Sequence, residues 1–311
     1  MFPCYKPIEL YQLKARYVQL DVIPTMASPN FIFPRVLIGN VKIGTPGVEY
    51  RMLIDFGIGT DTFVLSEKYE NKRRYFPGNS SSYTRENGTF EITQYHSSFY
   101  GIFAAGPYAQ GTIARDTFEV TTEMKFKQGF GMAQSVCDEL DYIFSRSPIE
   151  GVLSMASVDR TRNSLKSFVH AILQSISTPF VNIWVETLQI SHKRTHSILN
   201  KEQEAIITFG DIDRVHCLEE SGFFTRLLPN SNWAFNLRSI RFINRTQIEM
   251  LNLDGTSTDI VFIFDDEYKM QLSPADYIVE EWDRPGKCIL SFMDADEIPD
   301  EGVQWYFLFL Y

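Results

Sequence analysis

The clearest pattern of hydrophobic and polar positions runs from Val41 to Ser66, VKIGTPGVEYRMLIDFGIGTDTFVLS. Val41 and Ile43 alternate with polar residues, the turn sequence GTPG interrupts them, and an apolar stretch then continues through Ile54. Alternation broken by glycine and proline is typical of two strands joined by a turn. We therefore predict one strand on each side of the GTPG sequence.

The second of these strands ends in an acidic residue, Asp55, which is followed by the glycine-rich sequence FGIG. A carboxylate at the end of an apolar strand is costly unless it is hydrogen-bonded or used in chemistry. Gly57 and Gly59 can adopt positive φ angles and present backbone N–H groups, which stabilise such an anion. Asp55 is therefore the first candidate for a functional side chain.

Further elements follow along the chain. Alternation returns at residues 91–120, which predicts a hairpin, whereas the charged and then Gly-, Ser- and Asn-rich residues 67–90 predict a loop. Near the N-terminus, Glu9 to Leu20 has the pattern of a short amphipathic helix. Leu165 to Ile176 is the clearest helix, because its apolar residues are three or four positions apart and a Thr-Pro pair ends it.

Composition narrows the class of protein. The 311 residues allow one large or two ordinary domains with an ample core, and the 25 Phe and 15 Tyr residues favour strands. The net charge of −10 argues against nucleic acid and against a basic membrane-surface patch as partners. No apolar run is long enough to span a bilayer, and the first residues lack the apolar core of a signal peptide.

The segment around Asp55 resembles the first active-site segment of the pepsin-like aspartic proteases. That family has IGTP, an apolar strand, Asp-Thr-Gly-Ser/Thr, and then a strand ending in Trp-Val. The matching residues here are Ile43–Pro46, Leu53–Asp55 and Phe63–Val64. The differences lie in the motif that contains the catalytic aspartate. Phe56 replaces the family's Thr, and Ile58 replaces its Ser or Thr.

Two other motifs point to different chemistry, and we reject both. The Asp-Phe-Gly triplet at Asp55 is also the magnesium motif of protein kinases, but no glycine-rich phosphate loop, VAIK or HRD motif precedes it. His192 and His196 have the spacing of a zinc motif without its Glu, so we interpret HKRTH as a solvated hairpin. We predict neither a metal nor a cofactor.

The resemblance extends to the hairpin that overhangs the active site in the family. Tyr100 and Gly101 stand at the position of the family's Tyr-Gly pair, with Gly111 and Asp116 at their places further along, although the tip IFAAGP is longer and apolar. The resemblance implies substrate-binding roles for Tyr100 and Gly101, and also for Gly57 beside the aspartate. The alternative for Tyr100 is a half-buried hairpin tyrosine.

The second half keeps the order of the family's motifs, with gaps. IEGVLSMA, with Ser154 at the family's second glycine, is followed by motifs that imply strands at residues 180–185, 233–237 and 258–264 and a turn after Phe209. Asp254, in DGTS, resembles the family's second catalytic aspartate with one residue of the motif deleted. The alternative is that DGTS is a polar turn before the next strand.

The resemblance implies a mostly-β, bilobal fold. We interpret residues 1–30 as an N-terminal arm, a remnant of a propeptide, residues 31–186 as a largely complete N-terminal lobe, and residues 187–311 as a reduced C-terminal lobe. The family is mostly secreted or lysosomal, which implies the same for this chain. Glycosylation sequons at Asn79 and Asn87, and a third at Asn244, agree with this only weakly, because such tripeptides arise by chance.

Aspartic proteolysis requires two carboxylates that face one water molecule, so that one holds a proton while the other acts as base. Asp55 is the first candidate and Asp254 the second, on a turn shortened by one residue. We predict a monomeric family member that does not cleave peptides but keeps a cleft for a peptide or protein ligand. The alternatives are an active aspartic endopeptidase that uses Asp55 and Asp254, and a β-rich interaction module.

Overall fold

The structure is a computed structural model of the whole chain. It describes residues 11–19, 35–56, 61–66, 73–92, 108–156, 165–185, 203–216, 237–243, 259–264, 268–272, 278–280, 288–290, 292–294 and 305–307. The described residues are mostly β-strand, as the resemblance predicted. The chain divides into two compact units, residues 1–26 with 34–222 and residues 27–33 with 223–311.

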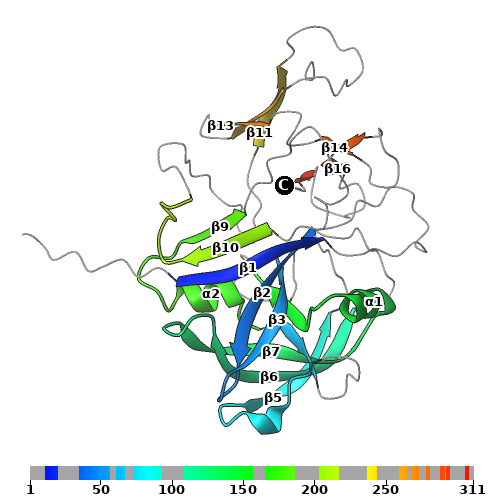
Figure 1. The fold of residues 1–311 in the computed structure, drawn as a ribbon, viewed down its shortest axis with the longest axis vertical. Helices are drawn as coiled ribbons and strands as arrows, with labels where there is room; N and C mark the ends of the chain where they lie inside the picture. The colour runs from blue at the N-terminus through cyan, green and yellow to red at the C-terminus, as the bar shows by residue number, and fades with distance from the viewer. Residues whose placement is uncertain are drawn as a thin grey trace, which may run out of the picture. The chain divides into compact units, whose positions relative to one another are not determined.

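The first unit is built on one sheet with the strand order β5-β6-β7-β4-β8-β3-β2-β1-β10-β9 (Figure 1). The helices described in this unit are α1 (Asp138–Arg146), α2 (Phe168–Leu173) and the 3₁₀-helix η1 (Pro77–Asn79). The strands of the sheet are β1 (Tyr11–Gln19), β2 (Arg35–Ile43), β3 (Val48–Asp55), β4 (Phe63–Leu65), β5 (Thr84–Ile92), β6 (Ala109–Glu119), β7 (Lys125–Val136), β8 (Gly151–Ser154), β9 (Val181–Val185) and β10 (Gln203–Phe209).

The central strands of this sheet are buried on both faces. Successive side chains of a strand point to opposite faces, and on β3 Met52 and Ile54 join one buried cluster while Leu53 joins another. A strand covered on both faces has a continuous apolar sequence rather than an alternating one. We call the two clusters the Met52 cluster (with Ile54, Val64, Phe118, Phe130 and Leu153) and the Leu53 cluster (with Ile38, Phe63, Phe90, Phe144 and Val152).

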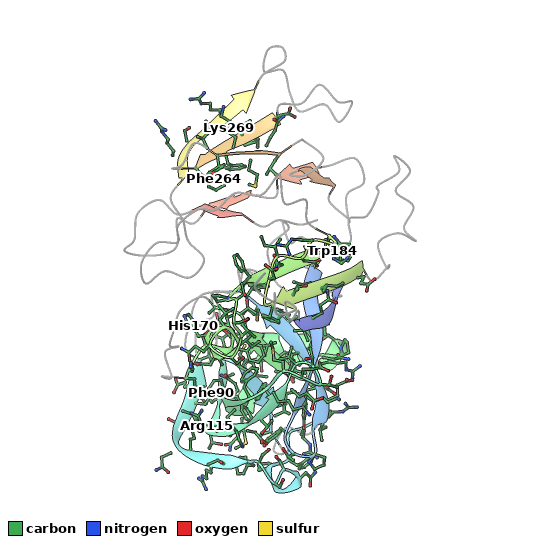
Figure 2. The ribbon with its side chains drawn as sticks, turned by 90° about the vertical axis from the view of Figure 1, so that its left-hand side faces the viewer. Phe90, Arg115, His170, Trp184, Phe264 and Lys269 are labelled. Carbon is green, nitrogen blue, oxygen red and sulfur yellow. The ribbon has the colours of Figure 1, made fainter. Side chains whose placement is uncertain are left out.

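The Leu53 cluster is closed at the edge of the sheet by an aromatic pair. Phe90 of β5 is 1% exposed and lies among the densely packed side chains of the first unit (Figure 2). Its ring centroid is 5.7 Å from that of Phe63, which lies on β4 in the middle of the sheet. This contact fixes the position of an edge strand whose other residues are mostly polar and exposed.

The helix predicted for Glu9 to Leu20 is wrong, because Tyr11–Gln19 form strand β1. β1 lies between β10 and β2 and pairs with both in antiparallel register (Figure 1). Leu13 on this strand is 2% exposed. Pairing on both edges with strands far away in the sequence outweighs the weak local pattern, which is common because strand preference depends on context.

Two other predictions need correction in their bounds. The loop predicted for residues 67–90 is wrong from Thr84 onward, where β5 begins with a polar sequence that does not alternate clearly. The helix predicted for Leu165 to Ile176 is confirmed, but α2 is shorter. Helix α1 was not predicted.

The turn after β10 was predicted from the resemblance, and a buried carboxylate closes it. Asp213, 2% exposed, accepts hydrogen bonds from Thr208 Oγ1, from the Val215 N–H and from the His216 N–H, and its Oδ2 lies 2.7 Å from His216 Nδ1. Burial acts to raise the pKa of Asp213, but the hydrogen bonds outweigh it and lower that pKa. The His216 ring also stacks on Trp184, with 4.1 Å between centroids. Trp184 lies on β9, a strand predicted correctly (Figure 2).

The described residues of the second unit form three small antiparallel sheets. One has the strand order β11-β12-β13, the second pairs β14 with β15, and the third pairs β16 with β17. Residues Ile260–Phe264 of β12 are buried, and the strand predicted there is confirmed. The bounds are β11 (Leu237–Ile243), β12 (Asp259–Phe264), β13 (Lys269–Leu272), β14 (Ile278–Glu280), β15 (Cys288–Leu290), β16 (Phe292–Asp294) and β17 (Trp305–Phe307). That this lobe is reduced stays a prediction.

Across the described ranges, no helix has the length and apolar character needed to cross a membrane.

A buried aspartate holds the turn that follows β2. Asp116 of β6, 0% exposed, accepts hydrogen bonds from Ser82 Oγ at 2.5 Å, from the Thr117 N–H at 2.7 Å and from the Tyr75 hydroxyl. Burial acts to raise the pKa of Asp116, but the hydrogen bonds from Ser82, Tyr75 and Ser80 outweigh it, so the pKa is lowered. Burial and the bond to Asp116 together raise the pKa of Tyr75.

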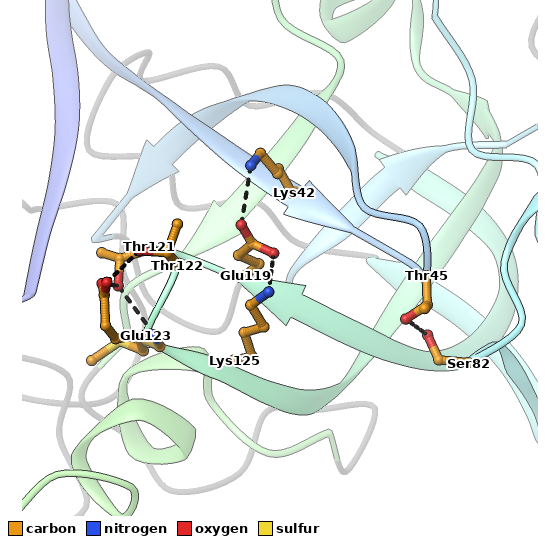
Figure 3. A network of polar contacts seen from close by, with 9 residues as sticks. Lys42, Thr45, Ser82, Glu119, Thr121, Thr122, Glu123 and Lys125 are labelled. Atoms are coloured by element: carbon orange, nitrogen blue, oxygen red, sulfur yellow. Dashed lines mark hydrogen bonds and ion pairs between the residues drawn. The ribbon is translucent and has the colours of Figure 1, made fainter.

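Figure 3 shows polar contacts on the surface of the same part of the first unit. Glu119 lies between Lys42 at 3.0 Å and Lys125 at 2.8 Å, and Thr45 Oγ1 is 2.7 Å from Ser82 Oγ. The two lysine side chains are about half exposed, and exposed ion pairs contribute only about 0–1 kcal/mol. The buried hydrogen bonds of Asp116 therefore stabilise the turn more than the surface ion pairs do.

Replacing Asp116 by Asn is expected to lower the free energy of unfolding by about 1.5–3 kcal/mol at neutral pH, because hydrogen bonds to a charged acceptor are lost. The folded-state pKa of Asp116 is lowered, so its stabilisation is present above the unfolded pKa of about 4 and is lost as pH falls through the folded pKa. Urea unfolding at several pH values should show the variant and the wild type converging in acid.

The matched control is Glu123→Gln, the same acid-to-amide change at an exposed site, where an effect within about 0.5 kcal/mol is expected. An Asp116→Asn difference that is as large in acid as at neutral pH would contradict this account of the network.

Candidate active site

Asp55 is the last residue of β3 and lies beside the end of β8. Strands β3 and β4 follow one another along the chain, but β8 separates them in the sheet. β8 pairs in parallel with β3, where Asp55 is opposite Ser154, and antiparallel with β4, where Phe63 is opposite Val152. Asp55 and the start of β4 therefore lie on either side of β8. We call this arrangement the β3-β8-β4 junction.

Hydrogen bonds hold the backbone on both sides of Asp55. The Met155 N–H donates to the Asp55 carbonyl at 2.6 Å, and the Ser154 N–H donates to Thr62 Oγ1 at 3.1 Å. The Thr62 carbonyl in turn accepts from the Gly131 N–H on β7 at 2.9 Å. All five residues are buried, and losing a partner there leaves a buried polar group unsatisfied. The junction therefore fixes the main chain that carries Asp55.

The strands of the junction approach so closely that one position requires glycine. A Cβ atom at Gly151 would lie 2.4 Å from the Phe63 carbonyl oxygen and 2.9 Å from Met52 Cε. Ser154, at the family's second glycine, is nevertheless accommodated, since it is 1% exposed and its Oγ accepts from the Ala156 N–H at 3.4 Å. The junction thus retains the glycine needed for packing.

Asp55 and the residue that follows it belong to opposite faces of the sheet. Asp55 is 0% exposed, and alternation along β3 places it on the face of Leu53. Phe56 is partly buried and packs against the Met52 cluster, where it continues the apolar series of Met52 and Ile54. A threonine at this position would present a hydroxyl group, whereas a phenyl ring has no hydrogen-bond donor or acceptor.

A second buried acid in this segment was missed by the sequence reasoning. Asp61 is 0% exposed and lies two residues before β4. Like Asp55, it has an interaction partner in the structure, as a buried carboxylate requires. The available signal was an acidic residue shortly before a continuous apolar run, whereas Asp55 stands at the end of such a run.

Four predicted site residues lie outside the described residues, namely Gly57, Tyr100, Gly101 and Asp254. Their roles, and the placement of the Tyr100 hairpin over Asp55, stay predictions. Within the described ranges, no three His, Cys, Asp or Glu side chains gather in a way that could hold a metal ion. Of the predicted catalytic and binding residues, the structure places Asp55.

The strand pattern, the IGTP turn and the buried aspartate indicate the aspartyl-protease family. Comparison of the sequence with known protein families gives the same result. The family model of eukaryotic aspartyl proteases matches residues 37–254, and the chain belongs to this family. Pepsin A of Bos taurus is 24% identical over 95% of this chain and 76% of its own length. Pregnancy-associated glycoprotein 2 of Bos taurus is 25% identical over 65% of this chain and 48% of its own length.

The hydroxyl of Thr62 gives a direct test of the junction. Thr62→Val keeps the shape but removes the acceptor of the buried Ser154 N–H, which should cost about 1–3 kcal/mol of unfolding free energy. Hydrogen exchange at the Ser154 amide should be faster in this variant than in the wild type.

Thr62→Ser serves as the control, because it keeps the oxygen and loses one methyl group, for an expected cost of about 0.8 kcal/mol. Equal losses in the two variants, with unchanged exchange at Ser154, would mean that this hydrogen bond does not stabilise the junction.

Proposed function

We propose that this chain is an aspartyl-protease homologue that does not hydrolyse peptide bonds and that keeps a peptide-binding cleft. The observation that carries the proposal is the position of Phe56, whose ring packs against the Met52 cluster directly after the first aspartate. At this position the family has a threonine, whose hydroxyl bonds across the two lobes. The phenyl ring supports the hydrophobic core and cannot form that bond.

The chemistry of the reaction explains why this change matters. Peptide hydrolysis by this family needs one carboxylate that takes a proton from water and a second that gives a proton to the carbonyl. A lone carboxylate with the ordinary aspartate pKa of about 3.9 is ionised at neutral pH and has no proton to give. The repulsion between two close carboxylates keeps one of them protonated, so a displaced second aspartate removes the acid.

Two sequence features add to the effect of Phe56. Ile58 replaces the hydroxyl residue that orients the first carboxylate in the family, and Asp254 stands in a motif that is one residue short. Losing one positioned acid or base lowers a rate typically by about 10²- to 10⁴-fold. Losing the alignment of both carboxylates should lower it further.

Binding requires the scaffold but not the proton transfers. The β3-β8-β4 junction keeps its hydrogen bonds and its glycine, which supports a cleft that remains formed. Extended peptides bind such clefts mainly through main-chain hydrogen bonds, with pockets for alternate side chains. We expect the ligand to be a peptide or protein segment, bound by a monomer that originates in the secretory pathway.

The same intact junction favours a second candidate, an active aspartic endopeptidase that uses Asp55 and Asp254. Family membership weighs against the third candidate, an interaction module without a cleft. The first two candidates differ in peptidase activity, which can be measured. The third differs from both because it would not bind a peptide in a cleft.

Activity is tested by incubating the purified chain with a denatured protein at acid pH, with and without a pepstatin-like inhibitor, beside bovine pepsin A as positive control. We expect no cleavage above that of the matched Asp55→Asn variant, because the acid of the pair is lost. Inhibitor-sensitive cleavage that disappears in Asp55→Asn would establish the endopeptidase instead.

Peptide binding is measured separately by fluorescence polarisation with a labelled peptide that bovine pepsin A cleaves. The cleft predicts saturable binding that excess unlabelled peptide displaces and that leaves the peptide intact. If polarisation does not change up to about 1 mM protein, where binding is worth only about −4 kcal/mol, the chain has no functional peptide cleft.

A further inference from the structure

A groove lined by both apolar and polar side chains opens beside the turn that follows β2 in the first unit. Its volume is about 320 Å³, and Val48 and Phe76 in its wall are each 39% exposed. Single exposed apolar side chains are ordinary, whereas apolar side chains that share one groove are candidates for covering by a ligand or a covalent group. Arg73 and Arg74 also line this groove.

Asn79 belongs to the same groove and begins a glycosylation sequon. It is exposed at the end of η1, and its sequence Asn79-Ser80-Ser81 is the acceptor tripeptide for N-linked glycans. The groove thus contains both an exposed apolar surface and a site at which a glycan can be attached.

The geometry of η1 brings Asn79 next to Phe76. The Asn79 N–H donates to the Phe76 carbonyl at 3.0 Å, which is the i→i+3 bond of a 3₁₀ turn. Phe76 is the extended residue directly before this turn, and Phe76 and Asn79 both line the groove. A sugar attached to Asn79 Nδ2 therefore begins beside the Phe76 ring rather than in open solvent.

The ring is held in place and is flanked by hydrogen-bond donors. The Arg74 guanidinium carbon lies 5.2 Å from the centroid of the Phe76 ring, a cation–π distance that restrains the ring. The C–H face of a pyranose packs on an aromatic ring, as other apolar groups do. Guanidinium N–H groups of Arg73 and Arg74 are suitable donors for the sugar hydroxyls.

We propose that Asn79 carries an N-linked glycan whose first N-acetylglucosamine covers Val48 and Phe76. In the transfer, Asn79 Nδ2 bonds to C1 of the first sugar of a lipid-diphosphate-linked oligosaccharide, and the C1–O bond to the diphosphate breaks. The amide nitrogen loses one proton, and the lipid diphosphate leaves with the bonding electrons. This inference rests on the proposed origin in the secretory pathway and does not depend on whether the chain cleaves peptides.

The sequon at Asn87 provides an internal control. Asn87 is also exposed and lies on β5, where the residues within two positions of it, Arg85, Glu86, Gly88 and Thr89, include no aromatic. A glycan at Asn87 would therefore lack the ring that Phe76 offers at Asn79. Occupancy can be compared at both sites, whereas a stabilising contact is expected at Asn79.

Occupancy is tested by producing the full chain behind a cleavable secretion leader in cultured mammalian cells. Peptide mass mapping before and after treatment with peptide N-glycosidase should show a glycan at Asn79, and Asn79→Gln should lack it. Because transfer takes place on the nascent chain, material from cell extracts reports occupancy even if a variant fails to fold. An unmodified Asn79 peptide in both secreted and intracellular protein overturns the proposal.

The covering of the groove is tested by a double-mutant cycle between Asn79→Gln and Phe76→Ala. Loss of the glycan should lower the folding equilibrium constant roughly 2- to 10-fold when Phe76 is present, and less than about 2-fold in Phe76→Ala. Asn87→Gln should have the same effect with either residue at position 76. An equal effect of Asn79→Gln in both backgrounds would show that the sugar does not contact Phe76 and that the groove is open to another partner.

Discussion

The arrangement of the first unit depends on strand β8. This strand lies between β3 and β4 in the sheet and pairs with both, although β3 and β4 are consecutive strands in the chain. Its parallel pairing with β3 and antiparallel pairing with β4 place Asp55 beside Ser154. Gly151 permits the close contact, and Thr62 satisfies a buried N–H that would have no strand partner there. Because both faces of these strands are covered, a change in any of them would disturb the two core clusters as well as the aspartate.

This constraint separates the scaffold of the site from its chemistry. The hydrogen bonds of the junction come from the main chain and from Thr62, so they persist whichever residue follows Asp55. Phe56 adds apolar contact to the Met52 cluster where the family has a hydroxyl that serves catalysis. A chain of this kind can keep the fold and the buried carboxylate while losing the proton transfers, and it can still bind an extended ligand.

The sequence predicted the elements whose pattern reflects their own burial. β3 was readable because a strand covered on both faces is continuously apolar, and Asp55 was identifiable as an acid at the end of such a run. β1 was misread as a helix because its pairing with β10 and β2 depends on residues far along the chain. The start of β5 was missed because an edge strand can be polar. Asp61 was missed because it stands before an apolar run rather than at the end of one, and it matched no chemical motif.

The central claim is that Asp55 has no second carboxylate coupled to it. Carboxyl-carbon NMR titration of Asp55 in the wild type and in Asp254→Asn tests this most directly, because two carboxylates that share a proton titrate as a pair. The account predicts the same titration midpoint for Asp55 in both proteins. A midpoint that changes by more than about one pH unit when Asp254 is replaced would show a coupled catalytic pair and contradict the account.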